Sequence, residues 1–203
     1  MNMIEDSKIL LDVCCGICLL GVIPQIDITN TYFIFSGDNL SDQNEYEKRL
    51  DTFLKVSKIY NLKNIFYFKY NHDKYLDFIK GFEDEKERGY RCYLCFSYRF
   101  NKLLTASIEL LSISPIAREF YSMARYFSTT LSISRYKDFQ TIERAANDVC
   151  EKIVLKNPDT FNLKFFDKSF RNDRLYRQSY AIAIENNLYR QNFCGCEFSK
   201  KNR

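Results

Sequence analysis

The sequence predicts an α/β fold in which helices flank a parallel sheet. Three apolar runs, Lys8–Val13, Thr31–Ser36 and Asn64–Tyr70, are rich in β-branched or aromatic residues and are typical of strands. The segment Asn44–Leu62 lies between the last two runs. Its apolar residues recur at intervals near 3.6, which indicates an amphipathic helix. This strand–helix–strand order favours parallel strands joined by right-handed crossovers.

The remaining elements follow the same pattern of alternation. Lys8–Val13 is expected to be a buried strand, and a helix is expected to begin just after Cys14 and Cys15. Pro115 lies within an apolar, helix-like stretch and is expected to divide it into two helices. The further helices predicted by apolar spacing are Tyr93–Leu111, Arg118–Arg125, Asp138–Leu155 and Asp173–Asn186.

Length and composition indicate one globular domain. The chain has 203 residues, of which 46% are hydrophobic, so residues 1–203 can bury a sizeable core. No run approaches the roughly 18 consecutive apolar residues of a membrane-spanning helix. The first residues, MNMIEDSK, are acidic and lack the basic region of a signal peptide. We therefore expect a cytoplasmic protein that does not contact a membrane, and we expect it to be a monomer.

Positive charge is concentrated near the C-terminus. The whole chain has a formal net charge of +4, whereas residues 161–203 contain nine Lys/Arg and four Asp/Glu, a local net charge of +5. This segment is also rich in Tyr and Phe, which is compatible with a nucleic-acid partner. The alternative is ordinary solvated basic surface. The cations that could neutralise phosphates are Lys164, Lys168, Arg171, Arg174, Arg177 and Arg190.

Seven of the eight cysteines fall into three tight groups, and only Cys150 stands apart. Cys150 lies in a helical pattern and is expected to be a free core cysteine. The groups are Cys14, Cys15 and Cys18; Cys92 and Cys95; and Cys194 and Cys196. In a reduced compartment, grouped thiols indicate metal or redox chemistry rather than a disulfide framework.

The first two groups can supply soft ligands to one metal centre. Cys14 and Cys15 follow the first strand, at the sheet edge where ligands bind in α/β folds. Helix-terminal N–H groups there favour thiolates. Cys92 and Cys95 form a C-x-x-C pair at an expected helix start. Zinc and an iron–sulfur cluster both accept four thiolates, so the spacing leaves both open.

The third group has a different spacing. Cys194 and Cys196 flank Gly195 in a C-x-C pair. A disulfide across this spacing closes a very small ring, which is strained and readily reduced. The pair is therefore suited to cycling between dithiol and disulfide. Two additional metal ligands remain the alternative.

Together these motifs resemble the QueH type of epoxyqueuosine reductase. The resemblance rests on five blocks in a fixed order: LLDVCCGIC, YEKRL, GFEDEKERGYRCYLCFSYR, FSTTLSISRYKD and LYRQNFCGCEFS. It implies an adenine-nucleotide-hydrolase-like (HUP-like) α/β three-layer sandwich. It also implies reduction of epoxyqueuosine to queuosine at the wobble position of tRNA anticodons, the last step of queuosine biosynthesis.

The resemblance further implies an iron–sulfur-dependent oxidoreductase. Its [4Fe-4S] ligands would be Cys14 and Cys15 with Cys92 and Cys95, and Cys194 and Cys196 would form a redox-active disulfide. An additional iron ion is associated with the family, without ligands that this sequence identifies. The partners would be tRNA, contacted by Arg174, Arg177 and Arg190, and an electron donor of unknown identity. The basic segment 161–203 would fold back over the active site.

Several positions depart from the family pattern. Ile17 and Arg135 stand where proline is usual, and Asp12 stands where histidine is often found. The segment Ser112–Glu119 is longer than expected. None of these departures removes a thiol of the proposed metal site. They leave open the roles of Asp12 and Cys18.

Other residues have open roles in catalysis or substrate binding. Epoxide reduction needs protons, and the candidate donors are Asp12 and the acidic residues Glu83, Asp84 and Glu85, although such acidic runs are usually solvated surface. His72, the only histidine, is expected at the surface or as a helix cap. Tyr189 and Phe193 could stack on bases or support the Cys194 loop.

Two other function classes share these features. A zinc-stabilised RNA-binding module would also combine clustered thiols, basic patches and aromatic residues. A tRNA sulfur-transfer enzyme on a related fold is the second alternative. ATP-binding thiolases have a Ser-Gly-Gly signature after the first strand, whereas this chain has CCGIC there, which argues against nucleotide chemistry.

Overall fold

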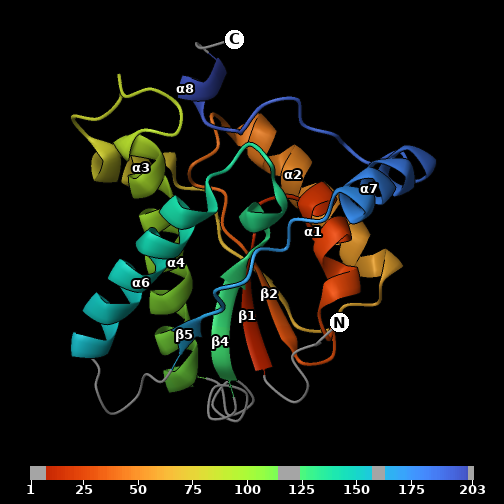
Figure 1. Ribbon diagram of the computed structural model, residues 1–203, viewed down its shortest axis with the longest axis horizontal. Coiled ribbons are helices and arrows are strands. Elements are labelled where there is room, and N and C mark those ends of the chain that lie inside the picture. Colours follow the sequence, from red (N-terminus) through yellow and green to blue (C-terminus); the bar gives the residue numbers. More distant parts are fainter. Residues whose placement is uncertain (1–7, 114–123, 157–162, 201–203) are drawn as a thin grey trace.

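The fold is built on one parallel sheet, which the computed structural model describes within residues 8–113, 124–156 and 163–200. The spatial strand order is β3-β2-β1-β4-β5, and every neighbouring pair is parallel (Figure 1). The strands are β1 (Lys8–Val13), β2 (Thr31–Phe35), β3 (Ile65–Tyr67), β4 (Ala124–Thr129) and β5 (Lys164–Phe165).

The three strands expected from the sequence are present, and two more were not predicted. β4 mixes polar and apolar residues and β5 has only two residues, so neither presents a long apolar run. The prediction of a helix at Arg118–Arg125 is wrong for its last two residues, because Ala124 and Arg125 belong to β4. The rest of that segment, including Pro115, lies outside the described residues.

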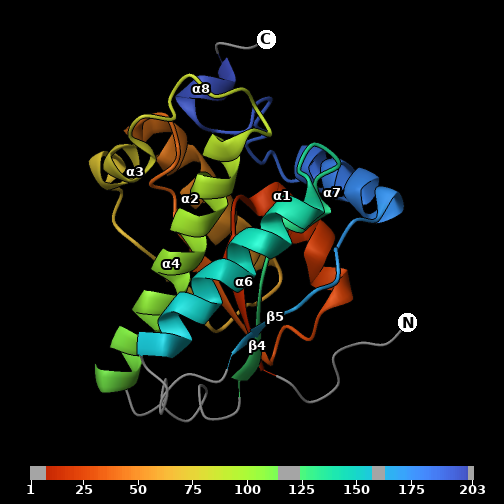
Figure 2. The same cartoon turned by 60° about the vertical axis from the view of Figure 1, so that its left-hand side comes forward.

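Helices cover both faces of the sheet and complete the predicted three-layer α/β fold (Figures 1 and 2). Alternation along β1 divides the core, because Leu11 and Val13 pack with α1 and α2 whereas Leu10 packs with α4 and α6. The helices are α1 (Gly16–Val22), α2 (Gln43–Ile59), α3 (His72–Ile79), α4 (Tyr90–Ile113), α6 (Phe139–Lys156), α7 (Asp173–Glu185) and α8 (Glu197–Lys200).

Long amphipathic helices match the sequence predictions better than short ones. The segments predicted for α2, α4, α6 and α7 agree with the observed helices to within a few residues. Cys150 lies on α6, where it packs against the core and donates to the carbonyl of Leu163. Short helices α3 and α8 were not predicted, and neither were the 3-10 turns Ile23–Gln25 and Thr130–Ile133.

The strand order creates a switch point between β1 and β4. From β1 the chain moves outward through β2 and β3, and it then returns to the other side of β1 to form β4 and β5. Ligands of open α/β sheets bind beyond the carboxyl ends of the strands at such a point. Within the described part of the chain, no helix has both the length and the apolar character needed to span a bilayer.

A buried ion pair fixes α4 to this edge of the sheet. Arg99 of α4 donates to both carboxylate oxygens of Asp12, over 3.0 and 2.6 Å, and Thr129 donates to the same carboxylate over 2.7 Å. Arg99 also donates to the carbonyls of Val13, the last residue of β1, and Ser36, the first residue after β2. Burial raises the pKa of Asp12, while Arg99 acts in the opposite direction and favours the carboxylate.

We expect Arg99→Leu to destabilise the fold by about 3–5 kcal/mol, because it leaves a buried carboxylate without its partner. Urea unfolding followed by far-UV circular dichroism measures this loss. Lys55→Ala is the matched control, since it breaks the exposed Lys55–Asp51 pair, which is worth about 1 kcal/mol or less. Equal losses in the two variants would contradict the structural role of Arg99.

Candidate metal and redox site

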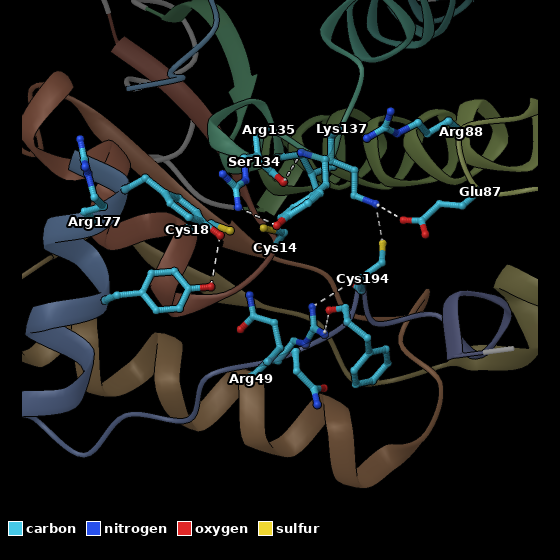
Figure 3. Close-up of a pocket in the computed structure, with 17 residues that line it drawn as sticks. Cys14, Cys18, Arg49, Glu87, Arg88, Ser134, Arg135, Lys137, Arg177 and Cys194 are labelled. Carbon is cyan, nitrogen blue, oxygen red and sulfur yellow. Dashed lines mark hydrogen bonds and ion pairs between the residues drawn. The ribbon is translucent and has the colours of Figure 1, made fainter. Parts of the chain in front are cut away.

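A cavity of about 780 Å³ opens at the carboxyl edge of the sheet, beside the switch point (Figure 3). Cys14 and Cys18 line it from the start of α1, and Cys194 lines it from the C-terminal segment. Its other lining residues come from α2, the segment before α4, the chain between β4 and α6, α7, and the segment after α7: Arg49, Glu87, Arg88, Leu131, Ser134, Arg135, Tyr136, Lys137, Tyr176, Arg177, Tyr180, Gln191, Asn192 and Phe193.

Three thiols converge where β1 turns into α1. The ligand atoms of Cys14, Cys15 and Cys18 all lie within 4.8 Å of one another, and all three residues are buried. We call this group the cysteine triad. Cys15 is the N-cap of α1, and its sulfur accepts the backbone N–H of Cys18 over 3.4 Å. Thr130, just after β4, donates to Cys14 Sγ over 3.3 Å and accepts from its backbone N–H over 2.9 Å.

The triad favours one thiolate, at Cys15. Burial acts against ionisation there, but hydrogen bonds from Cys14 and Cys18, together with Arg49, lower the pKa of Cys15 well below its usual value. The hydrogen bond to Cys15 raises the pKa of Cys14 to about 12. Hydrogen bonds from Cys18 to Cys14 and Cys15 raise the pKa of Cys18. The backbone N–H of Cys18, at the start of α1, also lowers the pKa of Cys15, which is the helix-terminal contribution expected from the sequence.

Cys92 and Cys95 occupy the first two turns of α4 and are not members of the triad. Cys92 Sγ accepts the backbone N–H of Arg88 over 3.3 Å, and burial raises the pKa of this thiol. Cys95 is buried against Cys196, and burial raises its pKa to about 12. The Arg99 guanidinium interacts electrostatically with both Cys14 and Cys95, one thiol from each group.

Cys194 is held by two cations. Lys137 donates to its sulfur over 2.8 Å, and Arg49 donates to its carbonyl over 3.1 Å (Figure 3). Glu87 pairs with Lys137 over 3.3 Å, and Glu45 pairs with Arg49 over 2.6 Å. A hydrogen bond from Cys196, followed by the charges of Lys137 and Arg49, lowers the pKa of Cys194, whereas the same bond raises that of Cys196. Cys194 is therefore the thiolate of the C-x-C pair.

Gly195 sits in a turn that a side chain could not occupy. Its φ of +120° is unfavourable for other residues, and an added Cβ would lie 2.6 Å from Leu40 and 2.8 Å from Arg49. Its carbonyl accepts the N–H of Ser41 over 2.8 Å. On the other side of Cys194, the Gln191 side chain donates to Cys15 Sγ over 2.7 Å. The C-terminal segment therefore contacts both the triad and α2.

The arginines expected to contact tRNA lie in different environments. Arg177 lines the cavity, whereas Arg174 is exposed on α7 without lining it, and Arg190 is exposed in the segment after α7. Tyr189 donates to Glu45 over 2.7 Å and therefore supports the loop. Phe193 lines the cavity, with the Arg49 guanidinium 5.6 Å from its ring centre.

Sequence reasoning did not single out Lys137, Glu87, Arg49 or Gln191. Each lies in or near a quoted motif, but only the fold brings them beside Cys194 and Cys15. Among the proposed proton donors, Asp12 is enclosed with Arg99, and none of Asp12, Glu83, Asp84 and Glu85 lines the cavity.

His72 differs from its expected role. Asn71 is the N-cap of α3. The imidazole is half-buried, with Nε2 2.9 Å from Glu197 and Nδ1 2.7 Å from the carbonyl of Asp38. It therefore ties α8 to the loop after β2.

A family model described as epoxyqueuosine reductase QueH matches residues 9–202 of this chain. The chain belongs to the QueH family. Among its relatives, the epoxyqueuosine reductase QueH of Thermotoga maritima is 30% identical, over 95% of this chain and 90% of its own length. The QueH proteins of Streptococcus pyogenes and Histophilus somni are 29% and 27% identical, over 96% and 95% of this chain and 71% and 72% of their own lengths.

Membership of the QueH family agrees with the resemblance inferred from the sequence and does not favour the zinc module or the sulfur-transfer enzyme. The donor set also fits a metal. Three buried sulfurs converge, and soft thiolate ligands select zinc or iron–sulfur centres. Arg49 and Arg99 supply positive charge that offsets the charge of coordinated thiolates. The QueH site can therefore hold a metal at the triad.

We expect Lys137→Met to raise the pKa of Cys194, because the ammonium that stabilises its thiolate is lost. At a given pH below the new pKa, the thiolate fraction falls, and alkylation of Cys194 by iodoacetamide slows. Peptide mass spectrometry under anaerobic conditions measures the alkylation rate of Cys194 over a pH series, and the pH at half-maximal rate gives its pKa. Lys152→Met, an exposed change on α6, is the control and should leave the pKa of Cys194 unchanged. If the pH dependence of alkylation in Lys137→Met is the same as in the wild-type protein, Lys137 does not stabilise the thiolate.

Proposed function

We propose that this chain reduces epoxyqueuosine to queuosine at the wobble position of tRNA. Membership of the QueH family supports the reaction, and the observation with the most weight is the shared cavity of Cys14, Cys18 and Cys194. One pocket thereby joins a candidate metal ligand set to a candidate redox thiol. The site of action we infer is the cytoplasm, where its tRNA substrate is found.

The chain's own thiols supply both electrons of the reaction. Removing the epoxide oxygen breaks two C–O bonds, forms a C=C bond and releases water, which requires two electrons and two protons. Oxidation of the Cys194 thiolate and the Cys196 thiol to a disulfide releases two electrons and one proton. The second proton comes from solvent water. An external electron donor, not yet identified, then restores the dithiol. Lys137 and Arg49 hold the reduced Cys194 at the cavity.

A [4Fe-4S] cluster is the cofactor we propose, with Cys14, Cys15, Cys92 and Cys95 as its ligands. Such a cluster supplies one-electron transfer when bound. Cys18 is a competing ligand, because it belongs to the triad whereas Cys92 and Cys95 do not. No residue is assigned to an additional iron ion.

Serine variants of each cysteine distinguish the two ligand sets. We expect Cys14→Ser, Cys15→Ser, Cys92→Ser and Cys95→Ser to lose most of the iron and sulfide that anaerobic reconstitution incorporates, because serine is a poor ligand for iron–sulfur centres. Cys18→Ser should keep both. Iron and acid-labile sulfide analysis, together with absorption near 400 nm, provides the measurement.

Cys150→Ser is the matched control, since Cys150 lies on α6, outside the cavity lining. Loss of iron in Cys18→Ser together with retention in Cys92→Ser would move the site to the triad. Retention in two or more of the four ligand variants would eliminate the assignment.

The decisive experiment is turnover. Anaerobically reconstituted protein with a chemical reductant should convert tRNA-bound epoxyqueuosine to queuosine, detected by nucleoside mass spectrometry. Cys194→Ser should keep iron and sulfide but lose most of the turnover, because a single thiol cannot form the disulfide. Loss of the cluster in that variant would make Cys194 a ligand, and full activity would remove the pair from the mechanism.

Binding of tRNA is proposed for the basic segment 161–203, including Arg174, Arg177 and Arg190. Exposed arginines can neutralise phosphates of the anticodon stem-loop. The contacts of Gln191, Cys194 and Gly195 with α1, α2 and the turn before α6 support a single domain in which this segment closes one side of the cavity.

A further inference from the structure

One side of the cavity contains no thiol and has no role in the redox chemistry. It is formed by the turn before α6 and by the first half of α7 (Figure 3). We call it the tyrosine–arginine wall, and it consists of Arg135, Tyr136, Tyr176, Arg177 and Tyr180. Arg135 and Tyr136 lie outside the basic C-terminal segment, so the charge distribution along the sequence did not point to them.

The tyrosines present aromatic surface to the cavity. Tyr136 is 51% exposed, although it is a large aromatic residue beside a cavity. The guanidinium of Arg135 lies 5.0 Å from its ring centre and donates to its hydroxyl over 2.9 Å, so one ring face and one edge are occupied. Tyr176 and Tyr180 have ring centres 5.1 Å apart and share a hydrogen bond between their hydroxyls.

The cations of the wall are exposed and have no carboxylate partner among the described residues. Arg135 donates only to Tyr136, and Arg177 donates to the carbonyl of Asp173 over 3.3 Å. No carboxylate oxygen of the described chain lies within 4.0 Å of either guanidinium. By contrast, the cavity cations Lys137 and Arg49 are paired with Glu87 and Glu45. Unpaired charge therefore lies on the wall, while Arg88, next to Cys92, is a further cavity cation without a carboxylate partner among the described residues.

We propose that the tyrosine–arginine wall binds a splayed-out nucleotide of an RNA loop, with its base stacked on Tyr136 and its flanking phosphates on Arg135 and Arg177. Aromatic platforms with cationic edges are how proteins bind single-stranded nucleic acid. A cavity of about 780 Å³ is within the usual size of ligand pockets. The inference rests on the proposed function for the identity of the loop as a tRNA anticodon.

The position of the wall orients the nucleotide. Cys18 and Cys14 lie between Arg177 and Cys194 in the view of Figure 3, and Arg135 lies on the side of Cys14. A base stacked on Tyr136 would direct its substituent towards these sulfurs, while the ribose–phosphate chain would follow the exposed arginines. The wall thereby determines which end of the nucleotide reaches the thiols. An acidic peptide would use the same cations but would gain little from the tyrosines, so the two ligands respond differently to substitution.

The test is equilibrium binding of an anticodon stem-loop RNA to anaerobically reconstituted protein over a series of salt concentrations. The probe has guanine at the wobble position, so no turnover is involved. Tyr136→Ala should weaken binding by about 5- to 100-fold without changing the salt slope, because one stacking contact is lost. Tyr136→Trp should restore affinity, since an aromatic face is restored.

Substitution of the wall arginines should instead change the salt dependence of binding. Arg135→Ala and Arg177→Ala should each reduce the slope of log K against log salt by about 0.7, the value for one phosphate contact on a single strand. Lys152→Ala is the matched control, because Lys152 is exposed near the end of α6 and does not line the cavity. This variant should leave slope and affinity unchanged. Iron content confirms that each variant retains the native site.

Unchanged affinity in Tyr136→Ala overturns the stacking proposal, even if the arginine variants alter the slope. If Arg177→Ala and Lys152→Ala have the same slope of log K against log salt, the proposed phosphate contact of Arg177 is wrong. Failure of the proposed function has a different signature, in which the wild-type protein binds the RNA through the wall but leaves epoxyqueuosine in tRNA unreduced.

Discussion

The ion pair between Arg99 and Asp12 is the interaction on which the site depends. It joins α4, which contains Cys92 and Cys95, to the end of β1, which leads directly to Cys14 and Cys15. The same guanidinium reaches the carbonyls of Val13 and Ser36, so it also fixes the ends of two neighbouring strands. An aliphatic residue could fill this space, but it could not satisfy so many carbonyl and carboxylate oxygens. Separate groups of thiols are thereby held at one edge.

Charge compensation is the second constraint around the sulfurs. Lys137 contacts Cys194 Sγ directly, and Arg49 interacts electrostatically with Cys15 while donating to the carbonyl of Cys194. These buried cations are themselves paired with carboxylates, so the charges of Arg49 and Lys137 are balanced before thiolates form. Low-dielectric surroundings make each of these contacts stronger than it would be in water. Cys15 and Cys194 therefore each have a cation close by, which favours their thiolate forms.

The fold was largely predictable because long elements with clear periodicity dominate it. β1 and α2 were located from apolar patterns alone, whereas β5, with two residues, has no periodicity to detect and forms because β4 offers an edge. The thiols could be grouped by spacing, but spacing does not reveal that Cys18 faces Cys14 across one helical turn. Lys137 could not have been found, since a lysine in a turn is ordinary until the fold brings Cys194 to it.

The turn at Gly195 has a consequence for the reorganisation that accompanies electron transfer. Hydrogen bonds hold the carbonyls of Phe193, Cys194 and Gly195, and Leu40 occupies the space that a side chain at Gly195 would need. The backbone between the two thiols is therefore fixed before any chemistry occurs. A change in the bonding of Cys194 must be accommodated by rotation of its side chain, which displaces few atoms. In the redox role proposed for Cys194, electrons then enter or leave while the backbone of this turn keeps its position.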